Sequence, residues 1–198
     1  MTFILDVFVL GADIFTTSID PSITLKSILE SREIIKCFFD VRNDSDALYN
    51  IYHISMTSVV DLQILENATR RGSKRLLNGL SRTICTDAGL AKDVLAKWVE
   101  VKKISTESGV KSEVAIIAQN DAVLEKNFKA FEIRPLPQAL IEYCINDVIH
   151  LPRLWLIYDR KLDYKWRAKT ENESTRITGE VGPEYAEKRR HGDSLPIL

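Results

Sequence analysis

Apolar residues occur in short runs along the first third of the chain, separated by polar and turn-forming residues. Residues 2–10 are apolar and rich in β-formers and end at Gly11, which predicts a strand. Residues 34–39, IIKCFF, are apolar apart from Lys36. This continuity is typical of a central strand in a parallel sheet. Val59 and Val60 predict a third, brief strand.

Helical periodicity fills the intervals between these strands. The segment LKSILES, residues 25–31, predicts a short helix, and Asn43 or Asp44 is placed to cap the next one. A third helix is predicted in DLQILENATR, residues 61–70. In the first two helices, the positions expected to face inward are Leu25, Ile28, Leu29, Leu48, Ile51 and Tyr52. Alternating strands and helices predict an α/β layer fold.

The second half of the chain is mostly helical in pattern. LLNGLSRTI, residues 76–84, and GLAKDVLAKWVEVKKI, residues 89–104, predict helices, and residues 105–127 predict mixed loop. Pro135 and Pro137 then stop the chain before another apolar-periodic run.

A change in composition marks the end of the predicted domain. From Lys169 onward the chain is charged and poor in large apolar residues, which predicts weak packing or disorder. We therefore expect one domain at residues 1–168 and a charged tail at residues 169–198.

Composition narrows the class of protein. The chain has 198 residues, of which 45% are hydrophobic and 28% are charged, enough for one domain with a core. A net charge of −1 demands no polyanionic partner, although it permits local basic patches. The three cysteines form no CxxC pair, and no apolar run reaches membrane-spanning length. These features predict an intracellular protein, cytoplasmic or nuclear, without a membrane partner.

The segment YCINDV, Tyr143 to Val148, carries the clearest chemical signal. On a helix, Tyr143 and Asp147 lie one turn apart on one face. An acid on a helix that packs into a core is costly to bury unless a cation accompanies it. The Tyr143–Asp147 pair therefore indicates half of a metal-dependent hydrolytic site. On spacing alone, an amphipathic helix with a packed tyrosine and a solvated aspartate is the simpler interpretation.

The surroundings of this motif resemble a known family. Residues 134–162 contain the Tyr143–Asp147 motif, and residues 34–70 contain Asp44 within NDSDAL. In this order the two segments resemble a DEDDy-type 3′-5′ exonuclease domain of the RNase D kind. The resemblance is greatest to fungal exonuclease-domain proteins of the Egalitarian-like branch. It implies an RNase H-like exonuclease fold, a mixed sheet flanked by helices.

One family motif has no counterpart in the sequence. The family builds its site from four carboxylates, and an Asp-x-Glu on the first strand supplies two of them. No Asp-x-Glu precedes Asp44, and two residues after Asp6 stands Phe8. The opening residues resemble the family's third strand instead. We therefore expect an exonuclease-like domain without its N-terminal hairpin.

The resemblance also implies roles for the matched residues. Asp44 and Asp147 would be ligands of Mg²⁺ or Mn²⁺, cations that prefer oxygen donors, and Tyr143 would position the attacking water. Tyr143, Asp147 and Asp44 are thus the candidate catalytic residues. With two of the four acids, we expect the metal to bind weakly, if at all. Asp40 and Asp6 are further candidates for the site, whereas Asp61 matches a structural position.

Basic residues suggest contacts with nucleic acid. Arg70, Arg71, Lys74 and Arg75 form a cluster that could meet phosphates, with Arg82 nearby. A solvated helix face is the simpler interpretation, because no aromatic stacking platform accompanies the cluster in sequence. Residues 188–191 form a second basic run in the tail.

Three functions fit these observations. The first is a 3′-5′ exonuclease acting on single-stranded RNA or DNA ends, weak or inactive as a nuclease because its metal site is incomplete. The second is a non-catalytic module that binds nucleic acid or a protein partner. The third is a repurposed fold that binds or converts a small molecule near Tyr143, Asp147, Asp44 and His150.

Overall fold

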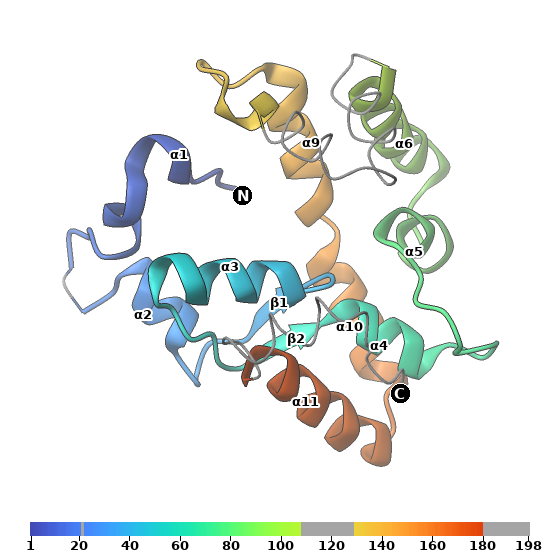
Figure 1. Ribbon diagram of the computed structural model, residues 1–198. Helices are drawn as coiled ribbons and strands as arrows, with labels where there is room; N and C mark the ends of the chain where they lie inside the picture. The colour runs from blue at the N-terminus through green and yellow to red at the C-terminus, as the bar shows by residue number, and fades with distance from the viewer. Residues whose placement is uncertain (21, 108–128, 180–198) are drawn as a thin grey trace, which may run out of the picture. The chain divides into compact units, whose positions relative to one another are not determined.

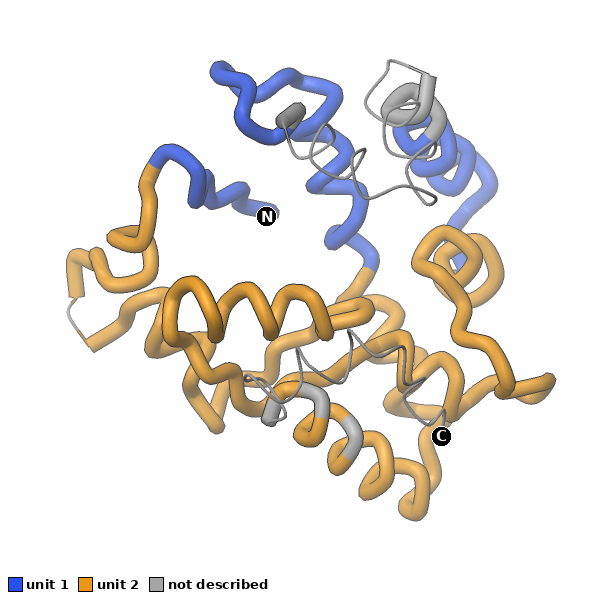
Figure 2. The backbone as a smooth tube through the Cα atoms, in the orientation of Figure 1, with its two compact units in different colours: residues 1–9, 89–150 blue, residues 10–88, 151–198 orange. Residues whose placement is uncertain are grey.

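The chain is organised as two compact units (Figure 2). The computed structural model describes residues 1–20, 22–107 and 129–179. Unit 1 comprises residues 1–9 and 89–150, and unit 2 comprises residues 10–88 and 151–198. The description below takes each unit by itself.

A small parallel sheet lies at the centre of unit 2 (Figure 1). Strand β1, Lys36–Phe38, pairs with β2, Val59–Asp61, and Phe38 stands opposite Asp61. The apolar run IIKCFF thus forms the expected parallel strand, but only in its middle. Ile34 and Ile35 precede the strand and are 44% and 54% exposed. Within the described residues the sheet has two strands, both parallel, rather than the mixed sheet expected.

Helices surround this sheet. Helix α3, Arg42–Tyr52, links the two strands, and α4, Leu62–Thr69, follows β2 directly. Helix α10, Leu151–Lys161, packs on α4, on β1 and on α5, Leu80–Asp87. Helix α11, Tyr164–Gly179, packs on β2, α3 and α4. The helices at residues 151–179 therefore pack on the strands and helices at residues 36–87.

The apolar core of unit 2 forms where the sheet meets these helices. The cluster consists of Val41, Met56, Val59 and Ile64, with Leu29, Phe38 and Leu48 packed against it. Helix α2, Leu25–Glu30, brings Leu29 to this cluster. Thr24 begins that helix with a reciprocal capping box, in which its hydroxyl accepts the N–H of Ser27 at 3.0 Å.

Unit 1 is built on a pair of helices. Helix α6, Lys92–Glu107, packs against α9, Gln138–Val148. The 3-10 helix η2, Lys129–Glu132, precedes Arg134. The Arg134 guanidinium donates to both carboxylate oxygens of Asp6 and thereby ties the start of the chain to this unit. The same guanidinium lies 5.1 Å from the centre of the Phe8 ring.

The strand predicted at residues 2–10 is wrong. Residues 7–10 form a short helix, α1, Val7–Leu10, which leads into the 3-10 helix η1, Gly11–Phe15. The Asp6 carboxylate accepts the N–H of Val9 at 3.2 Å. Such a local bond offers the backbone an alternative to a strand ladder.

Helix α3 differs from its predicted form in two details. It begins at Arg42 without a side-chain cap, so Asn43 and Asp44 lie in its first turn rather than before it. Ile51, predicted to face inward, is 64% exposed. Tyr52 does pack inward, with its ring centre 4.6 Å from that of Phe15.

Helix α11 crosses the expected boundary at residue 168. It continues to Gly179 and buries Thr170 and Ser174. Residues 180–198, with the basic run at 188–191, lie outside the described residues, as does most of the loop predicted at 105–127. Among the helices that the structure describes, none combines the length and apolar character needed to cross a bilayer.

Candidate active site on helix α9

Helix α9 carries the Tyr143–Asp147 motif. Pro137 stands at its N-cap position, where a missing N–H costs nothing, and the helix runs unbroken to Val148. Leu140 is buried and fixes one face of the helix in unit 1. Tyr143 and Asp147 lie half-buried, one turn apart, as the spacing predicted.

A reciprocal pair of hydrogen bonds holds α9 to α6. The indole N–H of Trp98 donates to the backbone carbonyl of Asn146 at 2.9 Å. The side-chain amide of Asn146 donates to the backbone carbonyl of Trp98 at 3.1 Å. Trp98 is 3% exposed, so its N–H needs a protein partner and finds one. We call this pair of bonds the clamp. It fixes the position of α6 along α9, on which Tyr143 and Asp147 lie.

The clamp brings a lysine to the motif. Lys102 lies one turn after Trp98, and its ammonium forms an ion pair with Oδ1 of Asp147. The same ammonium stands 4.1 Å from the centre of the Tyr143 ring and 5.6 Å from that of Trp98. The side chain of Lys102 is 12% exposed and that of Asp147 28%. Water therefore screens the pair only in part.

Burial also affects the phenol. It raises the pKa of Tyr143 above its usual value, and Cys144 adds to the rise. Tyr143 is therefore a neutral phenol at neutral pH, with a cation held against its face.

The described residues around Tyr143 do not fit a divalent metal. An acid that binds Mg²⁺ or Mn²⁺ must offer its oxygens to the ion, whereas Asp147 already holds the ammonium of Lys102. Among the described residues, no group of three or more His, Cys, Asp or Glu side chains is placed to hold a metal. The cation that the sequence led us to expect beside Asp147 is a side chain of the protein itself.

Asp44 lies in unit 2, in the first turn of α3, with its side chain exposed. Desolvation by the surrounding protein atoms, followed by the negative charges of Asp40 and Asp61, raises the pKa of its carboxyl. The surface exposure limits the desolvation, but the two like charges act in the same direction. Asp44 and the Tyr143–Asp147 pair belong to different units, so their meeting in one site stays a prediction.

The other acids near Asp44 have structural partners. Asp61 is 2% exposed and accepts three backbone N–H groups, from Asp40 at 3.0 Å, Val41 at 3.1 Å and Gln63 at 2.9 Å. It therefore holds the turn between β1 and α3 and caps α4. Asp40 adopts a left-handed backbone with φ of 62° and forms a bidentate pair with Arg42, at 2.5 and 2.8 Å.

The remaining candidates lie elsewhere. Asp6 is paired with Arg134, whose hydrogen bond lowers the pKa of its carboxyl. His150 lies in the turn after α9, half-buried.

Of the four basic residues named from the sequence, two form hydrogen bonds within the protein and two are exposed. The Arg70 guanidinium donates two hydrogen bonds to the buried Glu66 carboxylate, at 2.8 and 2.7 Å, and others to carbonyls of Ser73 and Leu76. Lys74 donates to the Ala68 carbonyl at 2.6 Å. Arg71 and Arg75 are exposed. Their contact with nucleic acid stays a prediction.

Lys102 is the residue that sequence reasoning missed. Its only sequence signal is the spacing of four between Trp98 and Lys102, which places both on one face of a helix. Nothing in that spacing indicates that the partner is Asp147, which lies on another helix.

Comparison with known proteins places this fold in a family. A family model described as a 3′-5′ exonuclease matches residues 12–163. Solved structures of Trypanosoma brucei RNase D are also similar. The complex with GMP has a TM-score of 0.60 at 24% identity, covering 88% of this chain and 46% of that one. The complex with RNA U12 has a TM-score of 0.57 at 23% identity, covering 88% and 50%.

A third structure of Trypanosoma brucei RNase D has a TM-score of 0.58 at 23% identity, covering 88% of this chain and 52% of that chain. The chain thus spans about half the length of these RNase D structures. No curated protein matches the sequence. At this identity the structural likeness shows the RNase H-like exonuclease fold, and the family match covers most of the chain. The chain belongs to the 3′-5′ exonuclease family.

Proposed function

We propose that this chain is an RNase D-type exonuclease domain whose hydrolysis of nucleic-acid 3′ ends is weak or absent. The observation that carries the proposal is the ion pair between Lys102 and Asp147. Exonucleases of this kind use acidic side chains to hold divalent ions at the scissile phosphate. An acid that is already neutralised by a lysine attracts such an ion poorly.

The ammonium also opposes the metal directly. A divalent ion at Asp147 would meet a like charge at close range in a partly water-excluded site, where charges interact more strongly than in water. The ammonium of Lys102 also lies near the rings of Tyr143 and Trp98. Displacing it would sacrifice these contacts together with the ion pair. We therefore propose that Mg²⁺ or Mn²⁺ binds weakly, with Asp44 and Asp147 as the ligands if it binds.

A trimming assay tests the proposal. A 5′-labelled single-stranded oligonucleotide is incubated with Mn²⁺ and either the wild-type chain or its Asp147→Ala variant. Occupation of a metal-binding carboxylate by a lysine in a two-metal site should cost on the order of a thousandfold in rate, or about 4 kcal/mol. We expect little or no shortening by either form. Robust 3′ shortening by the wild-type chain that Asp147→Ala abolishes would overturn the proposal and establish a working exonuclease.

A further inference from the structure

A basic and aromatic surface lies where the loop after α4 meets the start of α11. The ammonium of Lys74 stands 4.0 Å from the centre of the Trp166 ring, and that of Lys169 stands 4.8 Å from it. Lys74 is itself anchored by its hydrogen bond to the Ala68 carbonyl. The fold thus joins Lys74 of the loop to Trp166, which lies far away in the sequence. All of these residues belong to unit 2.

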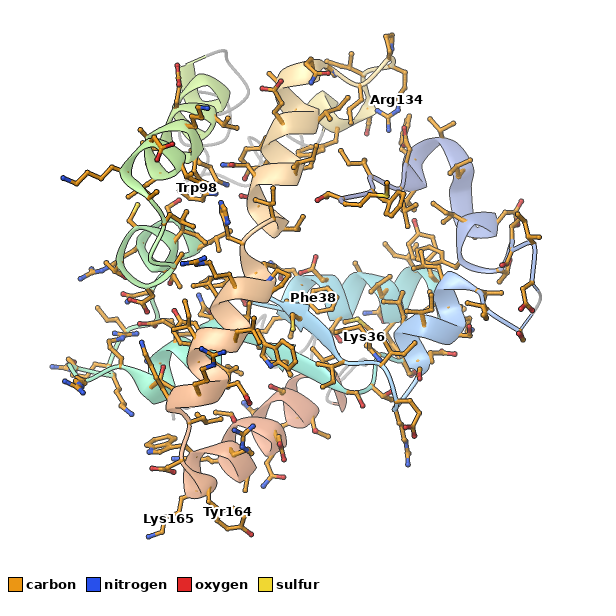
Figure 3. The ribbon with its side chains drawn as sticks, turned by 180° about the vertical axis from the view of Figure 1, so that it is seen from behind. Lys36, Phe38, Trp98, Arg134, Tyr164 and Lys165 are labelled. Atoms are coloured by element: carbon orange, nitrogen blue, oxygen red, sulfur yellow. The ribbon has the colours of Figure 1, made fainter. Side chains whose placement is uncertain are left out.

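The first turn of α11 presents an open aromatic ring. The Asp163 carboxylate accepts the N–H of Trp166 at 2.9 Å and so begins the helix. Tyr164 is 87% exposed. Figure 3 shows Tyr164 and Lys165 together at this end of the helix, both pointing away from the rest of the unit. Trp166 is half-buried beneath Lys74 and Lys169, so Tyr164 offers the freer face.

Two exposed lysines lie close to this ring in the sequence of α11. Lys165 and Lys169 are both exposed and lie one turn apart on α11, where like charges repel. Among the residues that the structure describes, no carboxylate forms an ion pair with either of them or with Lys74. The loop that carries Lys74 also carries the exposed Arg71 and Arg75. An anion with several charges would relieve this repulsion.

We propose that this surface binds single-stranded nucleic acid. We call it the α11 patch, and it consists of Lys74, Tyr164, Lys165, Trp166 and Lys169. Its lysines meet successive phosphates, and the Tyr164 ring stacks on a base. Alternating cations and an exposed ring match a chain that alternates phosphates with flat bases. An acidic peptide would use the cations but would leave the ring without a partner. The patch goes beyond the proposed function, because binding here needs neither metal nor hydrolysis.

Fluorescence anisotropy with a labelled oligouridylate, without divalent metal, tests the patch. The double variant Lys165→Glu, Lys169→Glu is compared with Lys92→Glu, Lys97→Glu, which makes the same charge change on the exposed side of α6. We expect the patch variant to bind about tenfold more weakly or worse, with a flatter dependence on salt, and the control to bind within about twofold of wild type.

A second pair of variants isolates the ring. Tyr164→Ala should weaken binding by about fivefold or more, and Tyr164→Phe should leave it almost unchanged, because phenylalanine keeps the stacking face. The proposal is overturned if the patch variants bind like wild type, or if the wild-type chain binds no oligonucleotide. It is also overturned if polyglutamate competes as well as unlabelled oligouridylate. The trimming assay tests the proposed function separately, because it follows hydrolysis rather than binding at the α11 patch.

Discussion

Lys102 changes how the Tyr143–Asp147 motif on α9 is interpreted, because it occupies the place expected for a metal ion. A tyrosine and an aspartate one helical turn apart indicate a place for a cation, and the chain supplies that cation as an ammonium. Replacing one partner of a half-buried ion pair leaves the other charge uncompensated. Asp147 without Lys102 would therefore seek another cation, and a divalent ion is the natural substitute.

The first prediction follows from this exchange. Lys102→Gln removes the ammonium and keeps much of the side-chain volume, so Asp147 becomes available to a metal. We expect the variant to bind Mn²⁺ more tightly than wild type, on the order of tenfold, because a repelling charge is gone. Isothermal titration calorimetry measures this difference.

Lys97→Gln serves as the control, because Lys97 is exposed on the same helix and its loss changes the net charge equally. Equal Mn²⁺ affinity for wild type and Lys102→Gln would mean that Lys102 does not govern the site. A gain in the Lys97 variant as well would point to net charge alone.

Asp44 gives the second prediction at this scale. Its pKa is raised in the folded chain, so the folded state holds the proton more tightly than the unfolded state does. Stability should therefore fall as pH rises from the ordinary aspartate range, near pH 3.9, through the raised pKa. Above that window the Asp44 carboxylate costs stability, beside Asp40 and Asp61.

Asp44→Asn removes this cost. We expect the variant to resist urea better than wild type at pH 7 and to lose this advantage below the ordinary aspartate pKa. Urea denaturation at the two pH values measures it. A variant that is less stable than wild type at pH 7 would show instead that the carboxylate makes favourable contacts.

At the scale of the elements, the clamp between α6 and α9 decides which residues meet. Trp98 and Asn146 exchange two hydrogen bonds across the pair of helices. Because Lys102 lies one turn from Trp98 and Asp147 directly follows Asn146, the clamp also aligns the ion pair.

The third prediction tests this clamp. Trp98→Ala empties a buried position and should lower the free energy of unfolding of unit 1 by about 3–5 kcal/mol. Trp98→Phe keeps a ring but leaves the Asn146 carbonyl without its donor, for a cost of about 1–2 kcal/mol. Hydrogen exchange of the amides of α6 and α9 reports the loss. Protection in Trp98→Phe equal to that of wild type would show that the indole N–H contributes nothing.

Sequence alone predicted those elements whose signals are local. The run at residues 25–31 predicted α2, Pro137 marks the start of α9, and the spacing of Tyr143 and Asp147 places both on one face of that helix. The opening residues were mispredicted, because a strand exists only with a partner strand and propensity does not supply one. The second half of α11 looked like a solvated tail, because its buried residues are the small and polar Thr170 and Ser174.

The same limit applies to the candidate site. Tyr143 and Asp147 could be read from the chain, because one helix holds both. Their contact with Lys102 could not be, since it joins two helices that only tertiary packing brings together. The aromatic partner of Lys74 was hidden for the same reason, as Trp166 lies on α11.

For the molecule as a whole, the family match and the helical fold with its small parallel sheet agree on an exonuclease scaffold. A fold of this kind supports more than one function, so the chemistry depends on the side chains that it positions. Here the scaffold is retained, while the cation beside Asp147 is a lysine. On our account, binding of nucleic acid and its hydrolysis are therefore separable properties of this protein.

Anomalous diffraction from crystals grown with Mn²⁺ tests the central claim most directly, because manganese is located without reference to the protein. Our account predicts no manganese peak at the carboxylate of Asp147, with the Lys102 ammonium remaining on that carboxylate and against the Tyr143 ring. A manganese ion coordinated by Asp147, with Lys102 turned away, would contradict it.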